Sequence, residues 1–391
     1  MSSPRSSNRN GNPKICFLTS VHDPENIRIF HKEAISLSAA GYDVTIVAPG
    51  EMNRQAGPIR IKAVPPPRQR LDRMTKTVWN IYRAGLSEGA LVYHFHDPEL
   101  IPVGLLLKAR GKRVVYDVHE DVPRDILDKF WIPTWLRRLV AILSGLFELS
   151  AARRMDGIVA ATPSIARRFT KAHTVTVRNY PLLNELDIRT EVNYCDRPLL
   201  FAYVGGITEV RGVRQIVQAL SLLPPSLGAR CDLAGAFDPP ELEQEISKMP
   251  GWPFVRFLRW QSRQGVAGVL SRARAGLLVL HPTEGFLESL PVKLFEYMTA
   301  GLPVIASDFP VWREIIDPAG CGILVDPLDP RAIADAMIWI LEHPKEAEGM
   351  GRRGAEAVQS TYNWSAEEKT LLGLYASFFK VDEATERLSR D

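Results

Sequence analysis

One short stretch, LESLPVKLFEYMTAGLPVIASD, carries three charged residues among many apolar ones. A helix is predicted from about Pro291 to Gly301, because proline favours the first helical turn and glycine the end. The amides at this helix start, with Glu288 just before them and Lys293 beside them, predict an anion site that suits phosphate. Glu296, one turn further in, offers two oxygens to a vicinal diol such as a ribose. The alternative is a surface ion pair next to an unrelated loop acid.

A second stretch, FAYVGGITEVRGVRQIVQAL, favours the binding interpretation. A predicted strand runs into Gly205 and Gly206, and Arg211 and Gly212 open a helix. Glycines let backbone approach a ligand closely, and an arginine at the start of a helix binds phosphate in a bidentate manner. The spacing is not the GxGxxG of a dinucleotide site, and a glycine pair alone is a weak signal. The two stretches together predict a specific phosphate site.

These stretches belong to a longer alternation of short β-branched runs and amphipathic segments, which is typical of parallel sheets covered by helices. The predicted strands of the first half are KICFLTS, DVTIVAPG, ALVYHFHD, RVVYDVHE and DGIVAATP. Those of the second half are PLLFAYVGG, ARCDLAG, PFVRFLR, AGLLVLHP, LPVIASD and CGILVDP. We expect an α/β protein with two Rossmann-like domains that face each other across a cleft, with ligands beyond the carboxyl ends of the strands.

The domain organisation follows from where this alternation lapses. Residues 1–13 are polar and lack the apolar core of a secretory signal, so we expect a flexible arm. The turn-rich segment at 179–197 predicts a linker, which gives one domain at 14–190 and a second at 191–391. The last helix is a candidate to cross back to the first domain.

The two chemical stretches resemble the donor half of retaining glycosyltransferases of the GT-B fold, family 4 (glycosyl transferases group 1). The alternating strands are similar to that family over nearly the whole chain. Glu288 and Glu296 match its two glutamates, separated by seven residues in its pattern, and EYMTAGLPVIAS resembles the segment that follows the second one. The GT-B fold is an expectation that this resemblance supports.

The resemblance also implies roles for single residues. Glu296 would bind the ribose hydroxyls, and Glu288 the hydroxyls of the donor sugar. Arg211 matches the usual lysine of the family and would hold the diphosphate together with Lys293. In the first half, VVYDVHED resembles the segment whose histidine lies near the transferred sugar, which indicates His119.

Three departures from the family pattern affect this interpretation. Gly206 stands where many members have an arginine, which leaves more of the phosphate charge to Arg211 and Lys293. The loop SVHDPENIRIF after the first strand lacks the usual paired glycines. Glu284, in HPTEGFLE, competes with Glu288 as the first acid, and we choose Glu288 for its spacing to Glu296.

The predicted mechanism is electrostatic. Departure of a diphosphate needs its charge neutralised, and two cations plus helix amides supply this. No DxD metal triplet is present, so we expect neither a metal nor another cofactor beyond the nucleotide sugar. No carboxylate stands out as a nucleophile, and the resemblance implies that the acceptor attacks on the side of the leaving group, with retention of anomeric configuration. The residues after PFVRFLR, Trp260 and Gln261, are candidates for contacts to the nucleotide base.

Two other functions compete with this interpretation. His94 and His96 lie on one face of a predicted strand, and with Asp97 they would suit the metal site of a hydrolase. His96 and Asp97 are otherwise candidates to line the cleft or bind the acceptor. For His119, a lone histidine at a strand end, a structural role is the alternative. A non-catalytic protein that binds sugar nucleotides is the third function considered.

Composition bounds the partners and the location. The sequence contains no run of about 18 apolar residues, so no membrane span is predicted. The four cysteines are scattered, which suggests reduced, buried thiols. We therefore expect a cytoplasmic protein. Residues 1–195 carry a net charge of +9 and the remainder −6. The segment 125–154 combines Trp131, Trp135 and many leucines with arginines, which suits either a core helix with solvated arginines or a helix at a membrane interface.

We therefore consider a peripheral contact with an anionic membrane at its cytoplasmic face, and expect no nucleic-acid partner. A glycan or lipid-linked acceptor in bacterial surface or exopolysaccharide biosynthesis is implied by the family alone. The residues do not select the base, the sugar or the linkage.

Overall fold

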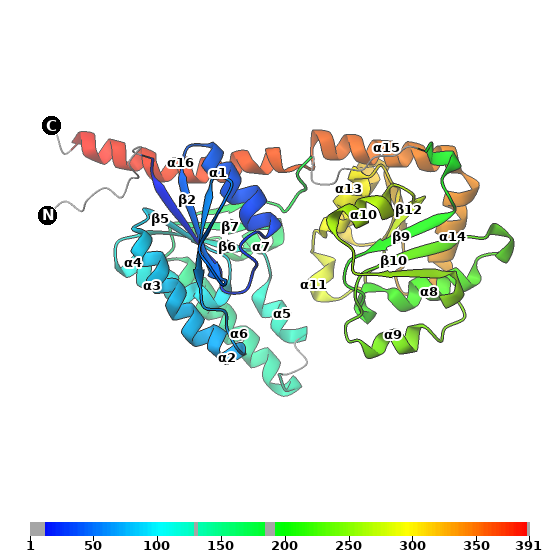
Figure 1. The fold of residues 1–391 in the computed structure, drawn as a ribbon, viewed down its shortest axis with the longest axis horizontal. Helices are drawn as coiled ribbons and strands as arrows, with labels where there is room; N and C mark the ends of the chain where they lie inside the picture. Colours follow the sequence, from blue (N-terminus) through cyan, green and yellow to red (C-terminus); the bar gives the residue numbers. More distant parts are fainter. Residues whose placement is uncertain (1–11, 129–131, 184–191, 389–391) are drawn as a thin grey trace. The chain divides into compact units, whose positions relative to one another are not determined.

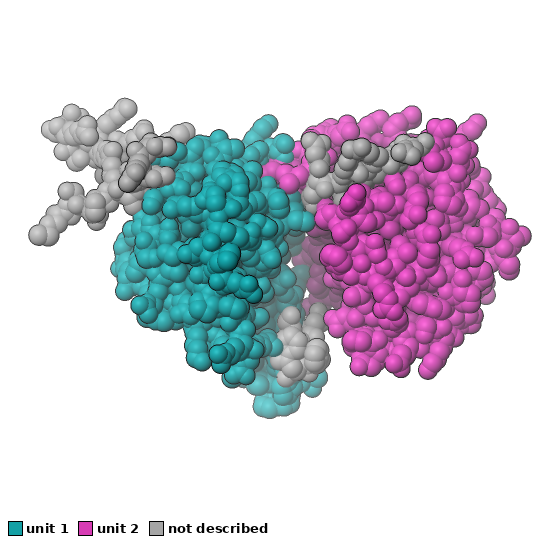
Figure 2. Space-filling model, viewed as in Figure 1, with its two compact units in different colours: residues 1–179, 365–391 teal, residues 180–364 magenta. Residues whose placement is uncertain are grey.

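The computed structural model describes residues 12–128, 132–183 and 192–388, and the chain divides into two compact units (Figures 1 and 2). Unit 1 holds residues 1–179 and 365–391, and unit 2 holds residues 180–364. The division at 179/180 precedes the boundary expected at residue 190, and the last segment of the chain groups with unit 1. Residues 1–11 of the expected arm and 184–191 of the expected linker lie outside the described residues.

Unit 1 is built on an eight-stranded sheet with the order β3-β4-β2-β1-β5-β6-β7-β8. Its strands are β1 (Lys14–Leu18), β2 (Asp43–Pro49), β3 (Arg54–Ala56), β4 (Ile59–Val64), β5 (Val92–Phe95), β6 (Arg113–Val118), β7 (Gly157–Ala160) and β8 (Thr174–Thr176). All neighbours pair in parallel except β3 and β4, which form an antiparallel hairpin. The five strands predicted for this half are present. The β3–β4 hairpin and the three-residue strand β8 were not predicted.

Helices cover both faces of this sheet (Figure 1). They are η1 (Ile27–Ala34), α1 (Ile35–Ala39), α2 (Arg70–Asp72), η2 (Arg73–Thr77), α3 (Val78–Glu88), η3 (Pro98–Leu100), α4 (Ile101–Ala109), α5 (Val122–Asp128), α6 (Thr134–Ala152), α7 (Pro163–Arg168) and α16 (Trp364–Leu388). One apolar cluster joins α3, α4 and α7 to alternate strand residues such as Leu18, Phe95 and Tyr116. Because side chains alternate along a strand, the intervening residues His94 and Asp117 lie on the opposite face, where α16 supplies Tyr375 to His94.

The segment after β1 departs from the regular helix that IRIFHKEAISLSAAG predicted. It begins as a π-helical segment, η1, and becomes α-helical only at Ile35. Within η1, Arg28, Lys32 and Glu33 are all buried, which places three charges beside the polar face of the sheet. Irregular π-turns inside helices are frequent at functional sites.

Unit 2 contains a six-stranded parallel sheet with the order β11-β10-β9-β12-β13-β14. Its strands are β9 (Leu200–Val204), β10 (Arg230–Ala234), β11 (Val255–Arg259), β12 (Ala275–Leu278), β13 (Val304–Ser307) and β14 (Gly322–Val325). Its α-helices are α8 (Val213–Leu222), α9 (Glu241–Ile246), α10 (Arg263–Leu270), α11 (Glu284–Leu287), α12 (Val292–Thr299), α13 (Pro310–Ala319), α14 (Pro330–Glu342) and α15 (Pro344–Ser360). The six strands predicted for this half are all present.

Two expectations about the chain as a whole can be checked. None of the helices in the described part of the chain has the length and apolar character that a bilayer crossing needs. All four cysteines are free thiols, but Cys195 is exposed, so the expectation that all four are buried is wrong for that residue.

Candidate functional site

The donor-side residues of unit 2 gather where β9 ends and α12 begins. The ammonium group of Lys293 is buried, although the side chain as a whole is only half-buried, and it has no hydrogen-bond partner among the described residues. It lies over the Tyr203 ring, 4.1 Å from the ring centre, a cation–π contact. A buried cation without an acceptor is costly, so this group is poised for an anion.

The two glycines are required by the cations beside them. Gly205 has a φ of +116°, and a Cβ there would lie 2.5 Å from Lys293 Cε. A Cβ on Gly206 would lie 2.8 Å from Arg211 Nη1, which donates to the Gly206 carbonyl at 3.3 Å. The glycine pair therefore makes room for Arg211 and Lys293, and both predicted phosphate ligands converge on one loop.

The pKa of Lys293 reflects its buried position beside Arg211. Burial, together with the positive charge of Arg211, lowers the pKa of Lys293 to about 7, while Glu296 opposes the shift. A bound anion would stabilise the ammonium form and reverse this effect. The arrangement can therefore hold a diphosphate through two cations and the amides at the start of α12.

Glu296 is buried on α12, and sequence reasoning missed its partner. Arg263, the first residue of α10, donates from Nη1 to Glu296 Oε1 at 2.6 Å. This contact occupies Oε1, so Oε2 is the carboxylate oxygen that Arg263 Nη1 leaves to a hydroxyl group. Arg263 and Glu296 are 33 positions apart, and no motif in the sequence connects them.

The two candidate first acids differ in their surroundings. Glu288 follows α11 directly and is partly buried, whereas Glu284, in the first turn of α11, is exposed. The loop after Glu288 is fixed because the Trp312 indole donates to the Ser289 carbonyl at 2.8 Å. Glu288 thus lies on a fixed loop and Glu284 on an exposed helical turn, and the choice of Glu288 stays a prediction from its spacing.

The candidates for base contacts follow β11. The Trp260 side chain is 75% exposed. Gln261 uses its amide to donate to the Leu258 carbonyl at 2.5 Å. Trp260 is thus available to a ligand, while Gln261 is occupied by its own loop.

In unit 1, His119 follows β6 and is partly exposed. Its Nε2 lies 3.2 Å from Nε2 of His22, and its Nδ1 lies 3.6 Å from Asp117 Oδ1. His22 belongs to SVHDPENIRIF, the loop that departs from the family pattern, and sequence reasoning did not connect it with His119.

His96 and Asp97, the candidates for lining a cleft or binding an acceptor, are both buried. Asp97 Oδ2 accepts from the Thr19 hydroxyl at 2.8 Å and the Ser20 amide at 2.6 Å. His96 stacks against Phe17 and His94. Asp97 therefore holds the loop after β1, and His96 belongs to the polar face of the sheet.

The residues that could hold a metal differ from the predicted set. Glu33, His94, His96 and Asp117 bring ligand atoms within 4.8 Å of one another, and Asp97 is not among them. Arg28 already pairs with both carboxylates, at 3.1 Å from Glu33 Oε1 and 2.8 Å from Asp117 Oδ2.

The protonation of this cluster balances its charges. Burial raises the pKa of Glu33 well above its usual range, and the charge of Asp117 raises it further. Burial also acts to raise the pKa of Asp117, but Arg28 and the neighbouring histidines outweigh it and hold that pKa well below its usual range. Burial lowers the pKa of His94 to about 4 and that of His96 well below its usual value. These shifts favour a neutral Glu33, neutral histidines and a charged Arg28–Asp117 pair in the protein without a bound ion.

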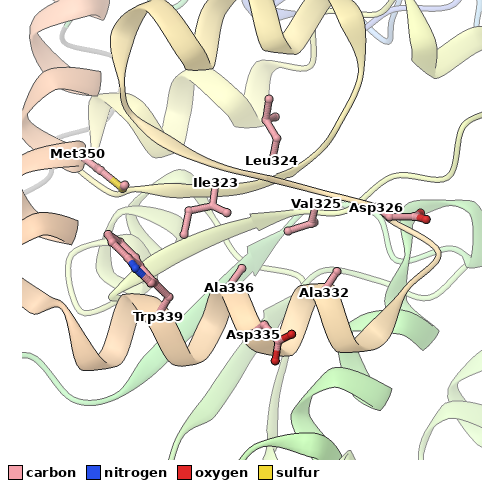
Figure 3. A pocket seen from close by; sticks show the side chains of 9 residues that line it. All are labelled: Ile323, Leu324, Val325, Asp326, Ala332, Asp335, Ala336, Trp339 and Met350. Carbon is pink, nitrogen blue, oxygen red and sulfur yellow. The ribbon is translucent and has the colours of Figure 1, made fainter.

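A groove of about 500 Å³ lies elsewhere in unit 2, between the edge strand β14 and helix α14 (Figure 3). Its lining is Ile323, Leu324, Val325, Asp326, Ala332, Asp335, Ala336, Trp339 and Met350. None of the donor-side residues belongs to it, so the groove is separate from the site described above.

Comparisons with known proteins assign the chain to a family. The profile of Glycosyltransferase Family 4 matches residues 28–178, and that of Glycosyl transferases group 1 matches residues 186–357. The chain is 39% identical over 297 residues to the D-rhamnosyltransferase WbpZ of Pseudomonas aeruginosa, which covers 72% of this chain and 71% of the relative. The chain belongs to the family 4 glycosyltransferases, and the family predicted from the sequence is confirmed.

Two further relatives are more distant. A phosphatidyl-myo-inositol mannosyltransferase of Mycolicibacterium smegmatis is 25% identical over 363 residues, covering 87% of this chain and 86% of the relative. An alpha-D-kanosaminyltransferase of Streptomyces kanamyceticus is 28% identical over 192 residues, and the chain spans 48% of that relative's length.

Solved structures support the fold. A sucrose-phosphate synthase of Thermosynechococcus elongatus has a TM-score of 0.74 at 20% identity, over 95% of this chain and 100% of that one. The HepE protein of Anabaena, solved in complex with UDP and glucose, has a TM-score of 0.71 at 13% identity, over 94% of this chain and 100% of that one. The two parallel-sheet α/β domains have the GT-B fold, as predicted.

Proposed function

We propose that this protein transfers a sugar from a nucleoside-diphosphate donor to a glycan or lipid-linked acceptor. The observation that carries the proposal is the buried ammonium of Lys293, which has no acceptor among the described residues. The Lys293 side chain lies against Gly205, and the Arg211 side chain lies against the adjacent Gly206. A diphosphate supplies the missing negative charge. The solved relative that holds UDP and glucose agrees with a donor of this class.

In this proposal each donor-side residue has one role. Arg211, Lys293 and the amides at the start of α12 hold the diphosphate and stabilise its charge as it leaves. Glu296, with Arg263 beside it, binds the ribose. Glu288 binds hydroxyls of the donor sugar. Trp260 contacts the base.

The proposed reaction retains the anomeric configuration. The acceptor hydroxyl attacks the anomeric carbon on the side of the departing diphosphate, and a phosphate oxygen of the donor takes the hydroxyl proton. Four bonds change in this step: the new glycosidic bond forms, the bond to the diphosphate breaks, the O–H bond of the acceptor breaks, and a new O–H bond forms on the leaving diphosphate. His119 orients the transferred sugar through its hydrogen bonds, as the family resemblance implies.

An acceptor at a membrane surface is supported by helix α6. Trp135, Leu139, Ile142, Leu143, Leu146 and Phe147 recur at helical spacing, and each is at least half exposed. Arg138 is exposed on the same helix, and the exposed Arg153 and Arg154 follow its last residue. The opposite face of α6, with Ala141, Gly145, Glu148, Ala151 and Ala152, is buried, so the helix packs on unit 1 and leaves an apolar face exposed. Trp131 lies outside the described residues.

An exposed apolar face with adjacent arginines suits the interface of an anionic bilayer. We propose that the protein works at the cytoplasmic face of a bacterial membrane, where a lipid-linked glycan of surface or exopolysaccharide biosynthesis is presented.

Calorimetry with UDP, GDP and ADP tests the donor site. The wild type binds one of the three, and Glu296→Ala and Lys293→Met weaken that binding. Lys345→Met is the matched control, because Lys345 is an exposed lysine of the same unit. A folded wild type that binds none of the nucleotides refutes the proposal.

A transfer assay follows with donors of the selected nucleotide, starting with mannose and D-rhamnose because two relatives are named for their transfer. Tight nucleotide binding with neither transfer nor donor hydrolysis would instead favour a non-catalytic binding protein. The anomer of the product, read by NMR, decides retention.

A further inference from the structure

The loop after β1 is held in one conformation by a single buried carboxylate. Asp97 Oδ2 accepts hydrogen bonds from the Thr19 hydroxyl and the Ser20 amide, with the Val21 amide at 3.3 Å. The His22 amide in turn donates to the Thr19 hydroxyl at 3.1 Å. These contacts fix the backbone at His22, so its imidazole has a defined direction.

That imidazole points at His119. The two Nε2 atoms are 3.2 Å apart, within hydrogen-bonding distance, and the ring centres are 5.1 Å apart with the planes tilted by 58°. The side chains are 28% and 22% exposed, so both rings are reachable by a ligand. Both residues follow parallel strands of one sheet, at the carboxyl edge where α/β proteins bind ligands.

The surroundings decide which ring donates. Nδ1 of His119 lies 3.6 Å from Asp117 Oδ1, too far for a hydrogen bond but close enough for the carboxylate charge to favour a proton on that nitrogen. Nε2 of His22 lies 3.4 Å from Asp97 Oδ1, whose charge favours a proton on Nε2. The pattern that agrees with both carboxylate charges puts a proton on Nε2 of His22, and this proton is donated to the nearer bare Nε2 of His119, at 3.2 Å, while Asp97 Oδ1 lies at 3.4 Å.

We infer that His22 is a positioning residue for His119, which fixes its Nδ1–H tautomer and leaves its Nε2 as a hydrogen-bond acceptor. A sugar hydroxyl that enters this pair meets one acceptor, Nε2 of His119, and one donor, Nε2–H of His22. A hydroxyl group is able to satisfy both at once. The role in sugar binding rests on the proposed function, whereas the proton pattern does not.

The proton pattern is tested by NMR of the full chain labelled with ¹⁵N-histidine, at about pH 8, where an ordinary imidazole is neutral. Long-range correlations between ring protons and nitrogens distinguish the two tautomers. We expect His119 as the Nδ1–H form and His22 as the Nε2–H form. In His22→Ala we expect the His119 signals to move towards a mixture of tautomers. In His22→Gln, whose amide keeps a donor, they return towards the wild-type pattern.

The controls are built into the same spectra. The signals of His94 and His96, buried on the polar face of the sheet, report whether a variant keeps its fold. His31→Ala removes an exposed histidine of the same unit and should leave His119 unchanged. Two results overturn the inference, whether or not transfer is observed. One is an Nε2–H tautomer for His119 in the wild type. The other is a folded His22→Ala variant in which the His119 signals are the same as in the wild type.

Kinetics test the consequence for transfer. Loss of one positioning hydrogen bond lowers kcat by roughly 3- to 10-fold in His22→Ala, with a much smaller change in the donor KM, and His22→Gln recovers most of the loss. A wild-type kcat in His22→Ala also overturns the positioning role. If the wild type shows no transfer at all, the proposed function fails, and the NMR result still decides the proton pattern.

Discussion

The Lys293 ammonium and the Tyr203 ring are in cation–π contact at 4.1 Å, and the ammonium has no hydrogen-bond acceptor among the described residues. Tyr203 lies on β9 and Lys293 on α12, so these two elements hold one buried positive charge between them. The charge is paired only weakly in the free protein. A bound anion would therefore stabilise the charged form of Lys293.

Nucleoside-diphosphate affinity should fall as the pH rises above about 7. Burial, with the Arg211 charge, lowers the pKa of Lys293 to about 7, so above that pH the free protein carries a neutral amine. Binding an anion then requires uptake of a proton, which weakens affinity by up to about tenfold per pH unit. Calorimetry from about pH 7 to 9 measures this. Lys293→Met should bind weakly with little pH dependence, and an affinity that is flat with pH in the wild type would contradict the prediction.

The lowered pKa of Lys293 also makes the free energy of unfolding depend on pH. Between the lowered pKa and the ordinary lysine value, the unfolded chain holds the proton and the native protein does not. The free energy of unfolding of the nucleotide-free protein therefore gains from Lys293 as the pH rises through this range, and Lys293→Met should remove that gain. Chemical denaturation of the two proteins at several pH values compares the slopes.

Gly205→Ala should abolish nucleotide binding and destabilise the protein by about 1 to 3 kcal/mol. The new methyl group meets Lys293 Cε, and the φ of +116° is unfavourable for alanine. Gly228→Ala is the matched control, because Gly228 has a φ of +62° but open space around its Cβ position. We expect the control to lose about 1 kcal/mol of stability and keep its nucleotide affinity. Equal effects of the two substitutions on binding would show that the Gly205 loop does not touch the ligand.

Arg263 should matter for binding more than for stability. Its guanidinium pairs with the buried Glu296 carboxylate but is itself substantially exposed, so solvent screens the pair. Arg263→Met should lower nucleotide affinity roughly 3- to 10-fold by releasing Glu296 from its binding orientation. Arg313→Met, which removes the exposed partner of Asp308, is the control and should leave affinity unchanged. The double variant Arg263→Met/Glu296→Ala should bind no worse than Glu296→Ala alone if the two residues act together.

The fold followed from the sequence because buried parallel strands are short runs of β-branched and other apolar residues between helices. Each of the eleven strands predicted in this way is present. The β3–β4 hairpin was not predicted because β4 is not a continuous apolar run. Arg60 and Lys62 alternate with Ile59 and Ile61, and only the face of β4 that carries the isoleucines is buried. The π-helical start of η1 has no residue signature that distinguishes it from an α-helix.

Some residues of the candidate site could be predicted from the sequence, and others could not. Glu288, Lys293 and Glu296 lie within one short stretch, so their spacing was visible in the sequence. Arg263 and His22 were not found because each acts on a residue more than thirty positions away. Only the order of strands in a sheet brings such residues together. The burial of His96 and Asp97 was not predictable from the sequence either, because their contacts to the loop after β1 and to the polar face of the sheet come from other strands.

The apolar face of α6 should bring the protein to anionic vesicles. Leu143→Glu and Leu146→Glu each place a charge on a face that is more than half exposed, so neither should disturb the core. Because a buried leucine contributes roughly 1.5 to 3 kcal/mol of transfer free energy, each substitution should weaken partition at least about tenfold. Added salt should weaken wild-type binding by screening the arginines. Leu328→Glu, which changes an equally exposed leucine of unit 2, should bind as the wild type does. Co-sedimentation with phosphatidylglycerol vesicles measures all four proteins, and equal partition of the α6 variants and the wild type would exclude α6 as the contact.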